Sequence, residues 1–286
     1  MNCAVGRKGK TCYSLESLKK IALAYNQKLM TESKHRTVNM NPIKLSSDSG
    51  EIYEQLRQRL KDFCNDNEKC WKDLDFVKSL DDLEIEKFTF LPDAPQGRYA
   101  WLSTIDIEDA LNQYSKLHND FHFLGAVPMD FDDLPVLGIK NLNFLELYKN
   151  GTKRIGIVFN TDEHYKPGQH WVSAFVDLHK KQAYFFDSVG SKPDQRVIAF
   201  LARAVKNIMK IHKCTFDDVD IMYNNVQHQQ GDTECGVYSI NFIRRIINGE
   251  AFRDIIREVM TDEKMNECRK VYFDTVNKSK KSRRSS

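Results

Sequence analysis

Residues 170–188 read HWVSAFVDLHKKQAYFFDS, and this stretch decides the fold of the second part of the chain. Two runs rich in β-branched and aromatic residues flank a short polar segment at 178–181, which predicts an antiparallel hairpin of fixed register. His170 begins the first strand and Asp187 follows the second, so both should emerge at the same end of the sheet. The hairpin therefore predicts that a histidine and a carboxylate seventeen positions apart lie close together.

A cysteine suited to nucleophilic attack follows downstream. Cys235 comes after a polar turn and opens a run of helical apolar spacing over 236–247, which an Asn-Gly pair should end. A helix N-terminus and a neighbouring imidazolium both stabilise a thiolate, the form of cysteine that attacks a carbonyl. We expect Cys235 to be the nucleophile, His170 its general base and Asp187 the group that orients the imidazole. A buried cysteine on its own is more often a core residue.

The turn before Cys235 offers a donor for an oxyanion. A tetrahedral intermediate needs hydrogen-bond donors for its oxygen, and the backbone N–H of Cys235 with the side-chain amide of Gln229 would provide them. Gln227 and Gln230 are rival amides, and His228 is a rival base. The order His, Asp, Gln, Cys favours catalysis over a set of unrelated core residues.

These residues resemble those of the ubiquitin-like-protein-specific cysteine proteases, the SUMO-deconjugating and adenovirus-proteinase group. The resemblance covers about residues 97–260 and rests on His170-Trp171, Phe186-Asp187-Ser188, Gln229 and Asp232-Thr233-Glu234-Cys235-Gly236. It implies an α+β fold with a papain-like core of the adenovirus-proteinase type, in which helices flank a central mixed sheet. It also implies that His170, Asp187, Gln229 and Cys235 are the catalytic set and that no cofactor is needed.

The resemblance also implies a tryptophan clamp on the substrate. Trp171 follows the histidine and Trp101 opens a Trp-Leu element, the two places where the family holds the narrow Gly-Gly end of its substrate. Indole faces can confine a chain only where it lacks side chains, so glycine before the scissile bond would be selected sterically. Both tryptophans could instead be core aromatics. The chain departs from the cellular members after Leu102, where Ser103-Thr104 replaces Asn-Asp.

The overall layout is most similar to the thiol proteases of large DNA viruses, a group that includes the polyprotein-processing protease of African swine fever virus. We therefore expect a cysteine endopeptidase that cleaves at Gly-Gly-X-like sites and processes viral structural precursors during virion maturation, in the host cytoplasm and the virion. An isopeptidase that removes SUMO-like or ubiquitin-like modifiers is the alternative. A second alternative is an inactive scaffold or a nucleic-acid-binding protein that uses a basic tail.

The hydrophobic periodicity, with the breaks at proline, glycine and polar residues, predicts the domain organisation. Residues 1–95 should form a helical extension with a polar linker near 27–50, residues 96–275 the catalytic domain, and residues 276–286 a disordered tail of Lys, Arg and Ser. Besides the hairpin, strands are expected at 121–127, 154–159 and 220–226, and a helix at about 195–212.

Composition narrows the class of protein. The chain has 43 basic and 40 acidic residues, too even a balance for nucleic-acid binding by the whole surface. No apolar run could span a membrane, and the start lacks the apolar stretch of a signal peptide, so we expect an intracellular protein. An odd number of unevenly spaced cysteines predicts reduced thiols and no structural metal: Cys3, Cys12, Cys64, Cys70, Cys214, Cys235 and Cys268.

Overall fold

The chain forms two compact units, Met1–Pro92 and Asp93–Ser286, in a computed structural model that describes residues 2–33, 41–97 and 99–274. The expected basic tail at 276–286 and part of the expected linker lie outside the described residues. In the part of the chain that the structure describes, no helix is both long enough and apolar enough to cross a membrane.

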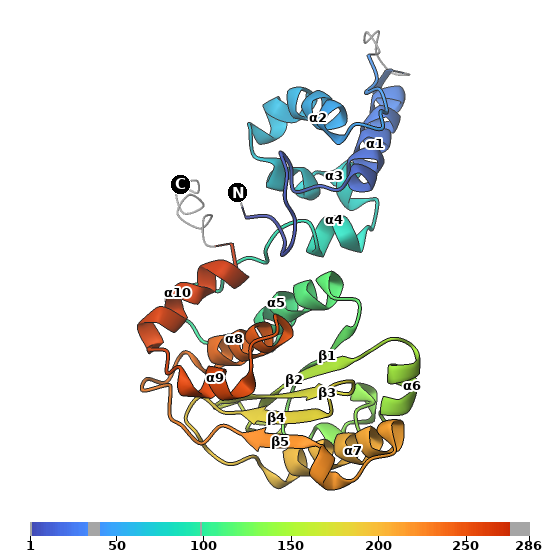
Figure 1. Cartoon of the computed structure of the whole chain (residues 1–286). Coiled ribbons are helices and arrows are strands. Elements are labelled where there is room, and N and C mark those ends of the chain that lie inside the picture. Colours follow the sequence, from blue (N-terminus) through green and yellow to red (C-terminus); the bar gives the residue numbers. More distant parts are fainter. Residues whose placement is uncertain (1, 34–40, 98, 275–286) are drawn as a thin grey trace. The chain divides into compact units, whose positions relative to one another are not determined.

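The first unit is helical, as expected (Figure 1). Its elements are α1 Leu15–Ser33, α2 Ser49–Cys64, the 3₁₀-helix η1 Glu68–Asp73, α3 Asp75–Lys78 and α4 Leu83–Lys87. The core forms around Trp71, which stacks on Tyr13 with ring centroids 5.6 Å apart. Helix α1 continues to Ser33, into the segment predicted as linker, because Leu29 extends its apolar stripe and packs against this core.

Two disulfides correct the prediction of seven reduced thiols. Cys3 pairs with Cys12 and Cys64 with Cys70, at Cα–Cα distances of 5.1 and 5.6 Å, within the range that a disulfide requires. All four lie in the first unit, whereas the free cysteines Cys214, Cys235 and Cys268 lie in the second. The odd total therefore hid an even number in the unit where the pairing occurs.

The second unit is built on a mixed sheet of five strands in the order β1-β2-β3-β4-β5. The strands are β1 Phe121–Val127, β2 Arg154–Asn160, β3 Trp171–Asp177, β4 Gln182–Phe186 and β5 Asp220–Tyr223. The outer pairs, β1 with β2 and β4 with β5, are parallel, and the inner pairs are antiparallel. This confirms the expected α+β fold, with the hairpin at its centre.

Helices cover both faces of the sheet, so β3 is buried along its whole length (Figure 1). On one face, the apolar side of α7 Gln195–His212 packs against the strands around Phe200, with α6 Phe144–Lys149 beside it. Helices α5 Thr104–Leu117 and α8 Cys235–Ile247 lie on the other face. The remaining elements are η2 Phe131–Asp133, η3 Pro135–Leu137, η4 Phe216–Asp218, α9 Phe252–Arg257 and α10 Asp262–Tyr272.

Candidate active site

The β3–β4 hairpin brings His170 and Asp187 together. Ser173 pairs with Phe186 in the antiparallel register, so the residue before β3 and the residue after β4 leave the same end of the sheet. Nε2 of His170 and Oδ1 of Asp187 are joined by a hydrogen bond of 2.6 Å. The other ring nitrogen, Nδ1, is left for a second partner.

Asp187 is buried and held in place by the chain that follows it. Its carboxylate accepts hydrogen bonds from the backbone N–H groups of Val189, at 3.0 Å, and Ser191, at 3.3 Å. Its own carbonyl accepts 2.7 Å from Nδ2 of Asn224, just after β5. The orientation of the carboxylate toward His170 is therefore set by the turn and by the neighbouring strand.

Cys235 is the first residue of α8 and is buried at its N-terminus, as predicted. Its thiol lies near enough to the imidazole of His170 to affect the pKa of the ring. The next residue must be small, because a Cβ on Gly236 would lie 3.0 Å from Cβ of Leu102. The glycine after the cysteine thus lets α8 approach the segment that precedes α5.

Electrostatics favour a charged imidazole at this position. Burial alone lowers the pKa of His170, but the hydrogen bond with Asp187 and the electrostatic interactions with Asp187 and Cys235 outweigh it and raise the pKa to about 9. His170 is therefore held as the imidazolium at neutral pH. A neighbouring imidazolium is a group that stabilises a cysteine thiolate.

Gln229 is buried in the turn before α8, and a serine orients its amide. The hydroxyl of Ser188 donates 2.7 Å to Oε1 of Gln229, so the nitrogen is fixed on the opposite side. Nε2 then donates 3.0 Å to the carbonyl of Gly231 and keeps a second N–H. Ser188 stood in the sequence motif, but its contact with Gln229, 41 positions away, had no local signal.

The rival amides do not take this place. Nε2 of Gln227 donates 2.9 Å to the backbone carbonyl of Gln229 and thereby braces the same turn. The side chain of Gln230 is exposed, and only its backbone N–H is engaged, by Asp262 at 3.0 Å.

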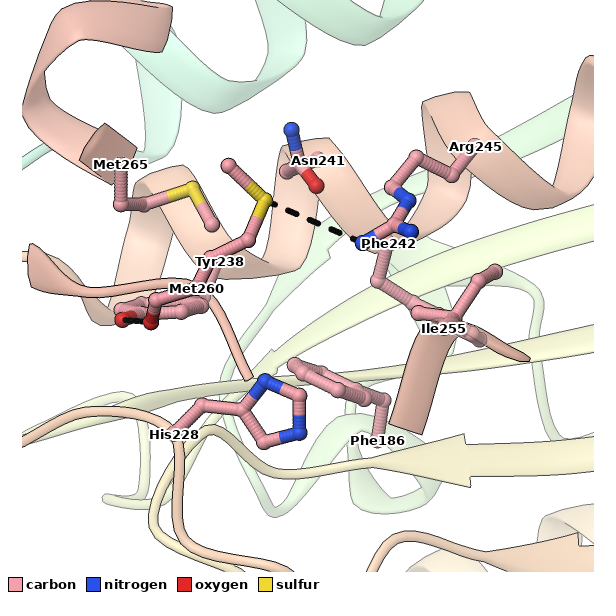
Figure 2. Close-up of a pocket in the computed structure, with 9 residues that line it drawn as sticks. All are labelled: Phe186, His228, Tyr238, Asn241, Phe242, Arg245, Ile255, Met260 and Met265. Carbon is pink, nitrogen blue, oxygen red and sulfur yellow. Dashed lines mark hydrogen bonds between the residues drawn. The ribbon is translucent and has the colours of Figure 1, made fainter. Parts of the chain in front are cut away.

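The rival base His228 points into a different cavity. Figure 2 shows its ring in a small pocket of about 10 Å³ between β4 and helices α8 to α10, with Phe186 and Tyr238 beside it. Nε2 of His228 lies 3.2 Å from the carbonyl of Ile256, and burial lowers the pKa of the ring. None of His170, Asp187, Gln229 and Cys235 lines this pocket.

The two tryptophans differ in exposure. Trp171 is only 6% exposed, and its Nε1 donates 2.9 Å to the carbonyl of Leu102. Trp101 is 45% exposed. The bond to Leu102 ties the segment that carries Trp101 to the start of β3, directly after His170. One indole is thus buried and fixed by a hydrogen bond, and the other is partly exposed to solvent.

Within residues 2–33, 41–97 and 99–274, the structure contains no cluster of three or more His, Cys, Asp or Glu side chains that could hold a metal ion.

Comparison with known proteins gives a consistent picture. Residues 152–283 match the model of the Ulp1 protease family, C-terminal catalytic domain. A protein of Acanthamoeba polyphaga mimivirus that is named as a thiol protease is 32% identical over 278 residues, which cover 93% of this chain and 90% of the relative. A cysteine protease of African swine fever virus is 27% identical over 71% of this chain and 76% of its own.

The solved structures show a shared fold. The crystal structure of an African swine fever virus protease superposes with a TM-score of 0.65 at 22% identity, and the match covers 96% of each chain. At this identity the likeness shows the fold, including the helical region that precedes the sheet.

Proposed function

Since the chain belongs to the Ulp1 protease family and is a cysteine-type peptidase, we propose that Cys235, His170, Asp187 and Gln229 are its catalytic residues. The observation that carries the proposal is the 2.6 Å bond between His170 and Asp187 beside a cysteine at a helix N-terminus. Membership of a peptidase family argues against the alternative of an inactive scaffold.

Each residue has a defined step. Sγ of Cys235, its proton held by His170, attacks the substrate carbonyl carbon, and the carbonyl oxygen becomes an oxyanion. The backbone N–H of Cys235 and the free N–H of Gln229 Nε2 donate to that oxygen. The imidazolium of His170 then gives its proton to the leaving amine, and a thioester forms. Water, deprotonated by His170, hydrolyses the thioester and regenerates the thiol.

Glycine before the scissile bond is the proposed specificity. The exposed indole of Trp101 and the wall formed by Trp171 lie on the segment and strand that the 2.9 Å bond to Leu102 holds together. Two planar rings that face the substrate would admit a chain without side chains and exclude a broader one. The substrate would thus present a slim, Gly-Gly-X-like stretch to Cys235.

The proposed substrate is a viral structural precursor, cut during virion maturation in the host cytoplasm and the virion. Support comes from the relatives, which are proteins of large DNA viruses. One African swine fever virus relative is named as a SUMO-1 cysteine protease, which favours release of a SUMO-like modifier as the second candidate.

The two candidate substrates can be distinguished by whether the protein cleaves a short peptide as well as a folded protein. We expect comparable kcat/KM on a Gly-Gly-X peptide and on a folded protein that carries the same sequence, and at least about a tenfold loss when the second glycine is changed to alanine. Trp101→Ala should reduce that discrimination between glycine and alanine. The measurement is cleavage followed by mass spectrometry on matched peptides, precursor fragments and SUMO conjugates. Turnover of the folded modifier alone would contradict precursor processing.

The pH profile should report the His170–Asp187 pair. Because the pKa of His170 is raised to about 9, the imidazolium is present below that pH and is lost above it, so kcat/KM should fall along an alkaline limb near pH 9. Asp187→Asn keeps a hydrogen-bond acceptor but removes the charge, and should move this limb down by about one pH unit or more.

A second histidine–carboxylate pair offers a matched control for that shift. Oδ2 of Asp130 lies 2.5 Å from Nδ1 of His164, and in the described part of the chain neither side chain hydrogen-bonds to a proposed catalytic residue. Asp130→Asn should leave the alkaline limb where it is. An equal shift in both variants would contradict the assignment of this limb to His170.

A further inference from the structure

We propose that Arg269 of α10 is a positioning residue for the nucleophile, which holds the turn before Cys235 and offsets the charge of Glu234, the residue that immediately precedes it. The inference rests on the proposed function of Cys235. Arg269 lies 34 positions downstream of the nucleophile, on a helix that the proposed mechanism does not use.

Glu234 is a buried carboxylate residue that directly precedes the nucleophile in the sequence. Glu234 is the N-cap residue of α8, but its side chain makes no capping hydrogen bond. The residue is only 4% exposed. Oε1 accepts 2.6 Å from Nδ2 of Asn266, and Thr233 donates to both oxygens. Glu234 directly precedes Cys235 in the sequence, and a buried negative charge close to a thiol disfavours a second negative charge on the thiolate unless a cation offsets it.

Arg269 is placed to supply that cation. The residue is 6% exposed, its Nε donates 2.8 Å to Oδ1 of Asn266, and one terminal nitrogen donates 3.3 Å to the carbonyl of Thr233. Asn266 therefore links the guanidinium to the carboxylate of Glu234. The second terminal nitrogen is buried and has no hydrogen-bond partner among the described residues, which costs free energy.

The field of Arg269 reaches both groups. Burial lowers the pKa of its guanidinium, and the charges of Glu234, Asp106 and Cys235 act in the opposite direction. Other charged or titratable groups also face this region: His170 and Asp187 at the sheet end, Asp106 on α5, Tyr238 on α8, and Asp262 and Cys268 on α10. Of these groups, His170 is the other cation.

One face of α10 holds the whole turn. Asp262, Asn266 and Arg269 follow the i, i+4, i+7 spacing and so point the same way. Asp262 accepts 3.0 Å from the N–H of Gln230 and 2.7 Å from that of Gly231, so it fixes the first half of the turn. Asn266 and Arg269 fix the second half. The oxyanion donors on either side of this turn depend on both attachments.

The test is a double-mutant comparison of pH profiles. Arg269→Gln should lower kcat/KM at neutral pH by about tenfold or more, with KM changed much less. It should also move the acid limb of the pH profile, which follows the formation of the Cys235 thiolate, to higher pH. Adding Glu234→Gln removes the charge that Arg269 offsets, so the double variant should return the acid limb close to its original position. Glu234→Gln alone should move the limb to lower pH. Arg203→Gln is the control, because Arg203 pairs with Asp132 at 2.7 and 2.8 Å on α7.

The same profile can be read without a substrate. Iodoacetamide alkylation of Cys235, followed by mass spectrometry at each pH, reports the thiolate directly. An acid limb that stays in place in both Arg269→Gln and Glu234→Gln overturns the inference, as does a double variant no closer to wild type than Arg269→Gln. Should Arg269→Gln fail to fold, Glu234→Gln alone decides. A wild-type chain that alkylates at Cys235 but cleaves no peptide contradicts the proposed function and leaves this comparison intact.

Discussion

Replacing Cys235 with alanine should abolish turnover, with a loss of kcat on the order of 10⁶-fold, as for removal of other covalent nucleophiles. The reason is that no other described thiol can substitute: Cys214 and Cys268 are the remaining free cysteines, and neither hydrogen-bonds to a histidine held by a carboxylate. The measurement is cleavage of a glycine-containing peptide by the purified chain, followed to long times.

A matched variant separates this effect from loss of a buried side chain. Cys214 is a free cysteine that packs against the core under α7, so Cys214→Ala should keep nearly full activity. Full activity in Cys235→Ala would overturn the catalytic assignment. Circular dichroism of both variants would establish that the fold is kept.

Replacing Gln229 with alanine should lower kcat by about 10²–10³-fold with little change in KM, the usual cost of removing one oxyanion donor. The amide is useful because its orientation is prepared: Ser188 holds Oε1 at 2.7 Å and Gly231 holds one N–H at 3.0 Å. The free N–H therefore needs no reorganisation when charge develops on the carbonyl oxygen. The measurement is steady-state kinetics on the peptide used for wild type.

Two neighbours make this prediction sharper. Ser188→Ala leaves the amide in place but releases its orientation, so it should cost less than Gln229→Ala, about tenfold. Gln230→Ala removes the adjacent amide, whose side chain is exposed, and should be close to wild type. If Gln230→Ala were as damaging as Gln229→Ala, the effect would belong to the turn and not to the amide.

The first unit contains the two disulfides that the cysteine count did not predict. Its two disulfides, Cys3–Cys12 and Cys64–Cys70, each close a short loop near the core around Trp71. Counting cysteines over the whole chain could not reveal them, because pairing depends on which residues fold into the same unit. The sequence predicted that a unit lay here but not which thiols it brings together.

The secondary structure of the second unit could be predicted closely because it follows from local chemistry. Alternating and β-branched runs placed β1 at Phe121–Val127 and β4 at Gln182–Phe186, and helical spacing placed α7 at Gln195–His212. The short turn of the hairpin then set the register, which brought His170 and Asp187 to one end. Each of these steps involves residues a few positions apart or joined by a single turn.

By itself, the sequence determined most of the strands, the hairpin and the cysteine that opens a helix. Only the tertiary structure decided what holds them: Ser188 on Gln229 across 41 positions, Asn224 on Asp187 across 37, and Asn266 on Glu234 across 32. The physical reason is the separation along the chain over which each kind of interaction acts. Periodicity and turn chemistry act within a strand, a helix or a hairpin, whereas a buried polar side chain takes whichever partner the packing of distant elements brings within hydrogen-bonding distance.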